Sequence, residues 1–282
     1  MNGSKRPARR RTHPSAWEAP SPDSRHLETL GPDALVWGLL LSAGLLAGFV
    51  DAVAGGGGLI ALPALLSAGV APHLALGTNK LAGTFGTASA ARAYIRAGIF
   101  QPSLWWPVAI ATFIGAATGS LLVLFVAAGE LRRFLPLAII VAAVYVAFSR
   151  RAKAGEAAVN THRTKGARAL GLGLGFYDGF LGPGTGAFWT SASMALFRLD
   201  LVAASGVARF MNFVSNLSSL VTFALLGSVH WLIGLGLGAA IFLGAQLGAR
   251  SAIRYGAGFI RPIFLMVVAL TAARLAWLEW FA

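Results

Sequence analysis

Cysteine is absent from the sequence, and only 12% of the 282 residues are charged. Without cysteine the chain forms no disulfide, thiolate metal site or cysteine nucleophile. An average soluble domain has about 25% charged residues, so the low charge content excludes an ordinary soluble globule. Acidic residues are especially few: 10 Asp and Glu stand against 23 Lys and Arg. The basic residues fall in the predicted tail, loops and helix ends, which is how membrane proteins are oriented, so we expect no nucleic-acid partner.

Apolar residues dominate what is present. Hydrophobic residues make up 56% of the chain, and the mean hydropathy is +0.70. A membrane-spanning helix needs about 20 apolar residues. Two long segments, 97–129 and 210–249, contain no Asp, Glu, Lys or Arg. The sequence therefore predicts an all-α, polytopic membrane protein.

Charges, Gly and Pro divide the chain into segments. The eight predicted spans are 33–54, 74–97, 103–127, 132–149, 167–181, 201–226, 230–253 and 258–280. Two shorter apolar segments, 59–70 and 187–199, follow glycine-rich breaks and are predicted half-helices. The predicted domains are a disordered basic tail (1–30), a first transmembrane repeat (31–149), a cytoplasmic linker (150–166) and a second transmembrane repeat (167–282).

The two halves share residues at a nearly constant offset. In chain order, the first-half positions are Gly48, Phe49, Asp51, Gly77, Lys80, Gly115, Gly119 and Arg132. Their second-half partners, in the same order, are Gly175, Phe176, Asp178, Gly206, Arg209, Gly244, Gly248 and Arg261. Such a repeat predicts two four-helix halves with a substrate site at their interface.

Lys and Arg favour the cytoplasmic side of a membrane. With eight crossings and a cytoplasmic N-terminus, fourteen of these residues fall inside and six outside. We therefore predict that both termini and the linker are cytoplasmic. One alternative stays open: if the first and fifth segments turn back as re-entrant hairpins, each half crosses three times and the halves are inverted.

Each half contains a glycine-rich break. The first has four consecutive glycines, Gly55, Gly56, Gly57 and Gly58, and the second has Gly182, Gly184 and Thr185. Non-helical backbone cannot face lipid, so each break must be buried in protein or line a wet cavity. The half-helix that follows begins with free N–H groups and a positive dipole end, which attract anions. The alternative is a pair of packing kinks.

Lys80 and Arg209 each lie about two turns inside a predicted span, where charged side chains usually face a cavity or a partner. Together with nearby polar donors they predict an oxyanion site; the alternative is that both snorkel to the interface. The candidate substrate-binding residues are Lys80, Arg209, Gly55, Gly56, Gly57, Gly58, Thr78, Asn79, Gly182, Gly184, Thr185 and Asn212.

Asp51 and Asp178 are the matched acids of the two halves. Each could balance a buried cation, cap a broken helix or take up protons in coupled transport, and a structural role is favoured. Two intramembrane acids also fit an intramembrane aspartyl protease. No Gly-x-Gly-Asp motif occurs, however, so transport is favoured over proteolysis.

Three segments resemble motifs of the TauE/SafE family of membrane permeases, also called sulfite exporters. They are Asp51–Pro63, Pro72–Lys80 and Gly175–Gly186, and the similarity extends over nearly all of 33–282. The resemblance implies a bacterial inner-membrane protein that moves small anions, with sulfite and organosulfonates as the best-known substrates. The Gly-Pro-Gly-Thr-Gly form of the second break is similar to a branch with no assigned substrate.

These features predict a secondary transporter of a small anion, driven by protons or by the gradient of the anion itself. An anion channel is an alternative that would use the same bases without alternating access. The expected partners are the anionic substrate and the lipid bilayer, and we expect no catalytic residue, metal or cofactor. Small-x-x-x-small glycine pairs favour internal helix packing, although they are also compatible with a homo-oligomer.

Overall fold

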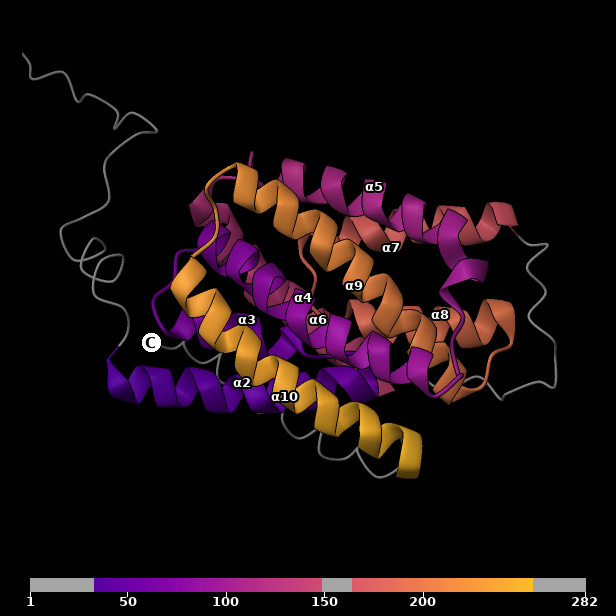
Figure 1. The fold of residues 1–282 in the computed structure, drawn as a ribbon. Helices are drawn as coiled ribbons and strands as arrows, with labels where there is room; N and C mark the ends of the chain where they lie inside the picture. Colours follow the sequence, from indigo (N-terminus) through magenta and orange to yellow (C-terminus); the bar gives the residue numbers. More distant parts are fainter. Residues whose placement is uncertain (1–32, 149–163, 256–282) are drawn as a thin grey trace, which may run out of the picture. The chain divides into compact units, whose positions relative to one another are not determined.

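The computed structural model describes residues 33–148 and 164–255, and all regular secondary structure in these ranges is helical. The helices are α2 (Ala34–Ala54), α3 (Gly58–Ser67), α4 (Pro72–Arg96), η1 (Pro102–Trp105), α5 (Trp106–Val123), α6 (Ala128–Phe148), α7 (Thr164–Phe180), α8 (Thr185–Phe197), α9 (Leu201–Leu225) and α10 (Trp231–Tyr255) (Figure 1). The all-α prediction is confirmed for this part of the chain. The predicted tail, most of the linker and the span 258–280 lie outside the described residues.

Seven of the predicted spans coincide with long helices, and both predicted half-helices are present as α3 and α8. Within the described ranges, three helical segments are long and apolar enough to cross a membrane: Ala34–Ala54, Pro102–Val123 and Trp231–Tyr255. Helices α4, α6, α7 and α9 are more polar or shorter, so their crossing of the membrane remains a prediction.

Large apolar side chains lie on the surface of the bundle as well as in its core, and some charged side chains are buried. Leu39, Ile110 and Leu243 are 56–64% exposed, whereas Lys80 and Arg209 are at most 1% exposed. Many Ser, Thr and Asn side chains of α4 and α9 are buried as well. Large apolar side chains on the surface together with buried charged side chains are typical of a helix bundle surrounded by lipid.

Glycines bring two pairs of helices into backbone contact. A Cβ placed on Gly48 of α2 would lie 2.0 Å from the carbonyl oxygen of Ile241 in α10, and one on Gly175 of α7 would lie 2.3 Å from that of Thr112 in α5. Gly48 and Gly175 are matched positions of the predicted repeat, and Thr112 and Ile241 are separated by nearly the same offset. Helix α2 of the first half thus packs on α10 of the second, and α7 of the second packs on α5 of the first.

The same contacts give the directions of the helices. Helix α2 contacts α10 at Gly44 with Leu237 and at Gly48 with Ile241, and α4 contacts α10 at Leu81 with Gly234 and at Phe85 with Gly238. In each pair of helices the residue numbers rise together, so α2, α4 and α10 are parallel. Helices α4 and α9 are antiparallel, because residue numbers rise along α4 as they fall along α9 in three contacts: Gly77 with Phe223, Gly83 with Asn216, and Tyr94 with Gly206. Helices α5 and α7 are parallel, as shown by Gly171 with Val108, Gly175 with Thr112, and Gly179 with Ala116.

These directions do not fit eight consecutive crossings. Consecutive crossings would make α2 and α4 antiparallel, and would make α4 and α9 parallel. The contacts give the opposite relationship in both cases. The glycine break after α2 lets the chain turn back through α3, so that α4 starts again from the end where α2 began. The alternative left open by the sequence, with a hairpin at the start of each half and inverted halves, fits these helix directions.

One consequence concerns the two ends of the helix bundle. Helix α2 begins level with the start of α10, because Trp37 lies against Gly236. Helix α7 begins level with the start of α5, which follows the end of α4. Asp33 and Thr164 therefore lie at opposite ends of the bundle. If this bundle crosses the membrane, Asp33 and Thr164 lie on opposite sides of it, whereas the sequence predicts that both lie at the cytoplasmic side.

Candidate functional site

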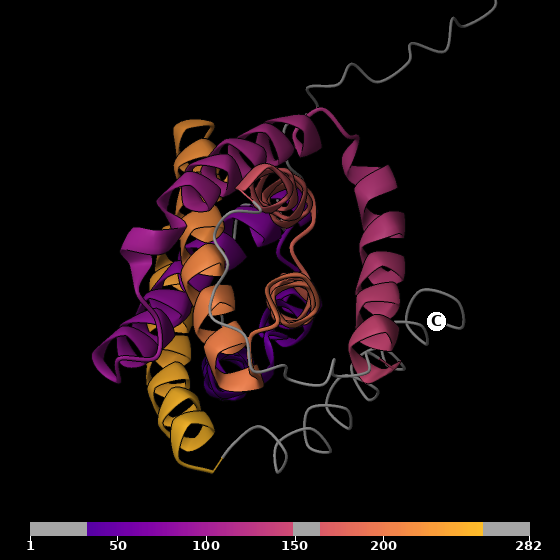
Figure 2. The ribbon, with the colours of Figure 1, turned by 90° about the vertical axis from the view of Figure 1, so that its right-hand side faces the viewer.

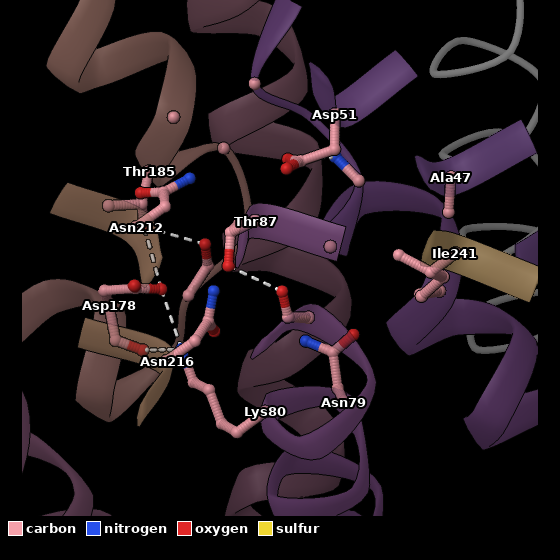
Figure 3. A pocket seen from close by; sticks show the side chains of 18 residues that line it. Ala47, Asp51, Asn79, Lys80, Thr87, Asp178, Thr185, Asn212, Asn216 and Ile241 are labelled. Carbon is pink, nitrogen blue, oxygen red and sulfur yellow. Dashed lines mark hydrogen bonds and ion pairs between the residues drawn. The ribbon is translucent and has the colours of Figure 1, made fainter. Parts of the chain in front are cut away.

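A small cavity of about 40 Å³ lies where the two glycine breaks meet the crossing of α4 and α9 (Figure 3). Main chain of both breaks lines it through Gly55, Gly57, Gly58, Gly182, Gly184 and Gly186. Polar side chains line it through Asp51, Asn79, Lys80, Thr87, Asp178, Thr185, Asn212 and Asn216. The view along α7 and α8 shows α9 and α10 on one side of these two helices and α6 on the other (Figure 2).

The backbone of each break has a conformation that only glycine adopts without strain. Gly55 and Gly182 have φ angles of +85° and +92°, in the left-handed region where a side chain is disfavoured. They are separated by the same offset as the matched acids Asp51 and Asp178. The breaks also touch each other: the amide of Ala187 donates a hydrogen bond of 3.2 Å to the carbonyl oxygen of Gly55. A Cβ on Gly55 would lie 2.3 Å from the carbonyl carbon of Gly186.

The two short helices begin at this cavity. Helix α3 starts at Gly58 and α8 starts at Thr185, and both residues line the cavity. The first N–H groups of a helix have no partner inside the helix and carry its positive dipole end. Two such ends at one cavity favour a negative occupant. One of the negative groups at these helix starts belongs to the protein itself, because the amide of Gly57 donates a 3.0 Å hydrogen bond to Oδ1 of Asp51.

Lys80 forms a buried ion pair with Asp178. Its Nζ lies 2.7 Å from Oδ1 of Asp178, and the two side chains are 2% and 5% exposed. Lys80 also donates to the main-chain carbonyl oxygen of Asp178. Thr185 donates to Oδ1 over 3.2 Å, and Ser215 donates to Oδ2. The carboxylate of Asp178 therefore accepts hydrogen bonds from three side chains.

Arg209 makes the equivalent pair with Asp51. Its Nη1 donates to the main-chain carbonyl oxygen of Asp51 and lies 3.5 Å from Oδ2 of the same residue. The Arg209 side chain is fully buried, whereas that of Asp51 is 13% exposed. Both pairs join the two halves of the chain: the base of each half contacts the acid of the other.

The cavity includes most, but not all, of the predicted binding residues. Lys80, Asn79, Asn212, Thr185 and the glycines 55, 57, 58, 182 and 184 line it, as do both acids. Gly56, Thr78 and Arg209 do not. Arg209 reaches the cavity only through Asp51, while Oγ1 of Thr78 accepts a 2.9 Å hydrogen bond from the amide of His230 just before α10. Whether the lining residues bind a substrate remains a prediction.

Thr87, Gly83 and Asn216 also line the cavity. Thr87 and Asn216 belong to the polar donors that the sequence places near the two bases, but they are not among the candidate binding residues, and Gly83 is in neither group. The signal for them was helical spacing. Lys80, Gly83 and Thr87 lie on one face of α4, and positions 209, 212 and 216 lie with the same spacing on the equivalent face of α9. A search one and two helical turns after each buried base would have found these positions.

Comparison with known proteins identifies the family. The sequence profile described as "Sulfite exporter TauE/SafE" matches residues 40–275. The chain belongs to this family. A probable membrane transporter protein, ORF9, from Sinorhizobium sp. is 39% identical over 238 residues, which cover 84% of this chain and 90% of the relative. No solved structure matches.

Two further relatives have similar names. The probable membrane transporter protein YfcA of Escherichia coli K12 is 36% identical over 241 residues, covering 86% of this chain and 90% of its own length. A probable membrane transporter protein of Haemophilus influenzae is 35% identical over 253 residues, covering 89% and 98%. The resemblance read from the glycine motifs is therefore confirmed, and the chain is a member of a membrane transporter family.

The geometry also bears on the enzyme alternative. In an aspartyl protease, two carboxylates share one proton and face each other. Here Asp51 and Asp178 are held by separate bases, Arg209 and Lys80. Membership of a transporter family is likewise consistent with a role other than catalysis.

Proposed function

We propose that this chain is a secondary transporter of a small anion, such as sulfite, an organosulfonate or a related oxyanion, and that the cavity between the glycine breaks is its substrate site. The observation that supports this most directly is the placement of Lys80 and two helix N-termini at one small cavity, with Arg209 directly behind Asp51. Each of these features attracts negative charge. Membership of the TauE/SafE family supports the transport role.

The size of the cavity favours a small substrate. A volume of about 40 Å³ has room for about three water molecules, at 10–15 Å³ each. A compact oxyanion is of this order, whereas a larger organic anion would require the two breaks to move apart. The side-chain amides of Asn79 and Asn212 supply further hydrogen-bond donors, whereas the Thr87 hydroxyl already donates to the carbonyl oxygen of Gly83.

Transport also requires access from both sides of the membrane. Gly48 packs on Ile241 in the same way as Gly175 packs on Thr112, which supports two structurally related halves. The opposite directions of α4 and α9 support an inverted relationship between them. Inverted halves that share a central site can rock against each other to expose it alternately.

The arginines support one orientation in the inner membrane. The basic side chains near the end of the bundle where α4 and α10 terminate are Arg92, Arg96, Arg168, Arg198, Arg250 and Arg254. Among the described side chains, the opposite end has Arg133. Basic residues within about 20 residues of a span determine orientation, and in the segment before α2 only Arg25 is that near. We infer that α4 and α10 end at the cytoplasm and that Asp33 lies at the outer side.

A flux assay tests the function. The purified full chain is reconstituted in sealed liposomes, and the uptake of sulfite, sulfate, thiosulfate and methanesulfonate is measured with and without a pH gradient. A transporter gives saturable uptake at a limited turnover, and Lys80→Ala abolishes it without preventing membrane insertion. Uptake that does not saturate and proceeds at channel rates would favour an anion channel, and no uptake of any anion would contradict the proposal.

A further inference from the structure

The acids of the two ion pairs are held unequally. The Asp178 carboxylate has three side-chain donors, and its closest cation lies at 2.7 Å. Among the described residues, the Asp51 carboxylate accepts one hydrogen bond, from the amide of Gly57, and its closest cation lies at 3.5 Å, beyond ordinary hydrogen-bond length. Asp51 is therefore the more weakly held of two acids at equivalent positions.

Arg209 is correspondingly less satisfied than Lys80. Its Nη1 donates to the main-chain oxygen of Asp51 rather than to the carboxylate, and its Nε is 3.4 Å from the carbonyl oxygen of Ser205. Its Nη2 has no hydrogen-bond partner among the described residues, although the side chain is fully buried. A buried guanidinium with a free donor retains capacity for an acceptor.

The charges of the site balance before any substrate enters. Two bases and two acids sum to zero, and all four side chains are at least 87% buried. An added monoanion would leave one uncompensated negative charge in a buried place, which is strongly unfavourable. Entry of the anion therefore requires that one carboxylate be neutralised at the same time. The proton that does this must reach an acid that is exposed to the cavity and weakly held.

We propose that Asp51 is the proton-coupling residue: one proton from water adds to its carboxylate when one anion binds, and both leave together. This inference rests on the proposed anion transport. Protonation removes the charge that faces Arg209, so the guanidinium charge acts on the anion instead. The Lys80–Asp178 pair stays closed throughout. One proton and one monoanion then move together without net charge.

The surroundings of Asp51 contain few other groups that titrate. Arg209 approaches from α9 and Lys80 lines the same cavity from α4. Tyr94, also on α4, donates a 3.4 Å hydrogen bond to the carbonyl oxygen of Ala52. Asp178 lines the cavity from α7. Helices α3 and α8 contain no titratable residue, and the part of α10 against the first break is apolar.

The test uses liposomes that contain a pH-sensitive dye and the full chain, with methanesulfonate as the probe. A sulfonate stays ionised throughout the range, so any proton that enters with it is bound by the protein. For the wild type we expect uptake to acidify the lumen, and an imposed inward proton gradient to drive accumulation. We expect Asp51→Asn to lose at least tenfold of the gradient-driven accumulation and to lose the acidification, while the exchange of internal for external methanesulfonate falls by a much smaller factor. Asp51→Glu should restore both.

Asp178→Asn is the matched control at the equivalent position of the second half. It leaves Lys80 without its carboxylate, so we expect exchange and accumulation to fall together, with a lower unfolding temperature in detergent. The inference is overturned if Asp51→Asn keeps acidification and accumulation, or if it loses exchange and thermal stability as Asp178→Asn does. If the wild type takes up none of the anions in the flux assay, the proposed function fails, which is a different result from failed coupling in an active transporter.

Discussion

Lys80 and Asp178, 98 residues apart in the sequence, form the closest ion pair in the part of the chain that the structure describes, with Nζ 2.7 Å from Oδ1. Lys80 also donates to the main-chain oxygen of Asp178, directly before the second glycine break. The pair therefore fixes the end of α7 against the middle of α4. It stabilises the shape of the cavity as well as neutralising two buried charges.

A double-mutant cycle should separate these roles. Lys80→Met leaves the Asp178 carboxylate buried without its cation, and Asp178→Asn leaves the ammonium without its anion. Removing one partner of a buried pair costs about 3–5 kcal/mol, whereas removing both charges costs much less. We expect each single variant to unfold at a lower temperature in detergent than the double variant. Additive losses would show that the two side chains do not interact energetically.

Glycines of α7 provide a test of helix packing with an internal control. A Cβ on Gly175 would lie 2.3 Å from a main-chain oxygen of α5, whereas one on Gly173 would meet nothing within 4 Å. Gly175→Ala must push two helices apart, so we expect a loss of about 1–3 kcal/mol. Gly173→Ala should be neutral or stabilising by up to about 1 kcal/mol, because Ala is the better helix former. Thermal unfolding of both variants is the measurement, and equal effects would contradict the backbone contact.

Much of the fold could be predicted from the sequence because its signals are local. Charges at 92 and 96 and glycines at 55–58 mark where helices end, and the apolar runs between them set helix length. The buried bases could be found for the same reason. Lys80 has no reason to lie deep inside an apolar span unless it faces a cavity or a partner.

The direction of each helix could not be predicted this way, because hydropathy is the same for a helix read in either direction. Whether the chain crosses at α3 or turns back there is a matter of long-range packing, which includes contacts between the two halves such as that of Gly55 with Gly186. The partner of each base depends on it in turn. With α4 and α9 antiparallel, Lys80 reaches Asp178 of the other half and not Asp51 of its own.

Alanine substitutions at Gly58 and Gly55 test two different effects: a methyl group that occupies part of the cavity, and strain in the backbone. A Cβ on Gly58 would lie 3.7 Å from its nearest neighbour, an ordinary contact, and Gly58 is the first residue of α3. We expect Gly58→Ala to remain as stable as the wild type while its methyl group reduces the cavity, so that anion affinity falls about tenfold, or about 1.4 kcal/mol. Substrate-dependent flux and thermal unfolding measure the two effects.

Gly55→Ala is the matched variant for strain. Its φ of +85° and the 2.3 Å approach to Gly186 are both unfavourable for a side chain, so stability should fall by at least about 1 kcal/mol. Full activity of a stable Gly58→Ala variant would remove the main reason for placing the substrate against the first break. The same reasoning applies to Gly57, where a Cβ would lie 2.6 Å from Cβ of Asp51 and the two effects are mixed.

The orientation of the bundle is open to a clean labelling experiment, because the native chain contains no cysteine. Single cysteines are introduced at Asp33, Ala97 and Gly166, which are all exposed and lie near helix ends. Asp33 begins α2, whereas Ala97 and Gly166 lie at the opposite end of the bundle, where α4 ends and α7 begins. We expect a thiol reagent that cannot cross the membrane, added to intact cells, to label Asp33→Cys and to miss Ala97→Cys and Gly166→Cys until the cells are opened.

Labelling of Ala97→Cys and Gly166→Cys alone would reverse the orientation while keeping the inverted halves, since Asp33 would still lie on the other side. Only a result in which Asp33 and Gly166 share a side would support eight consecutive crossings, and that result would contradict the parallel course of α2, α4 and α10 on which the inverted arrangement depends.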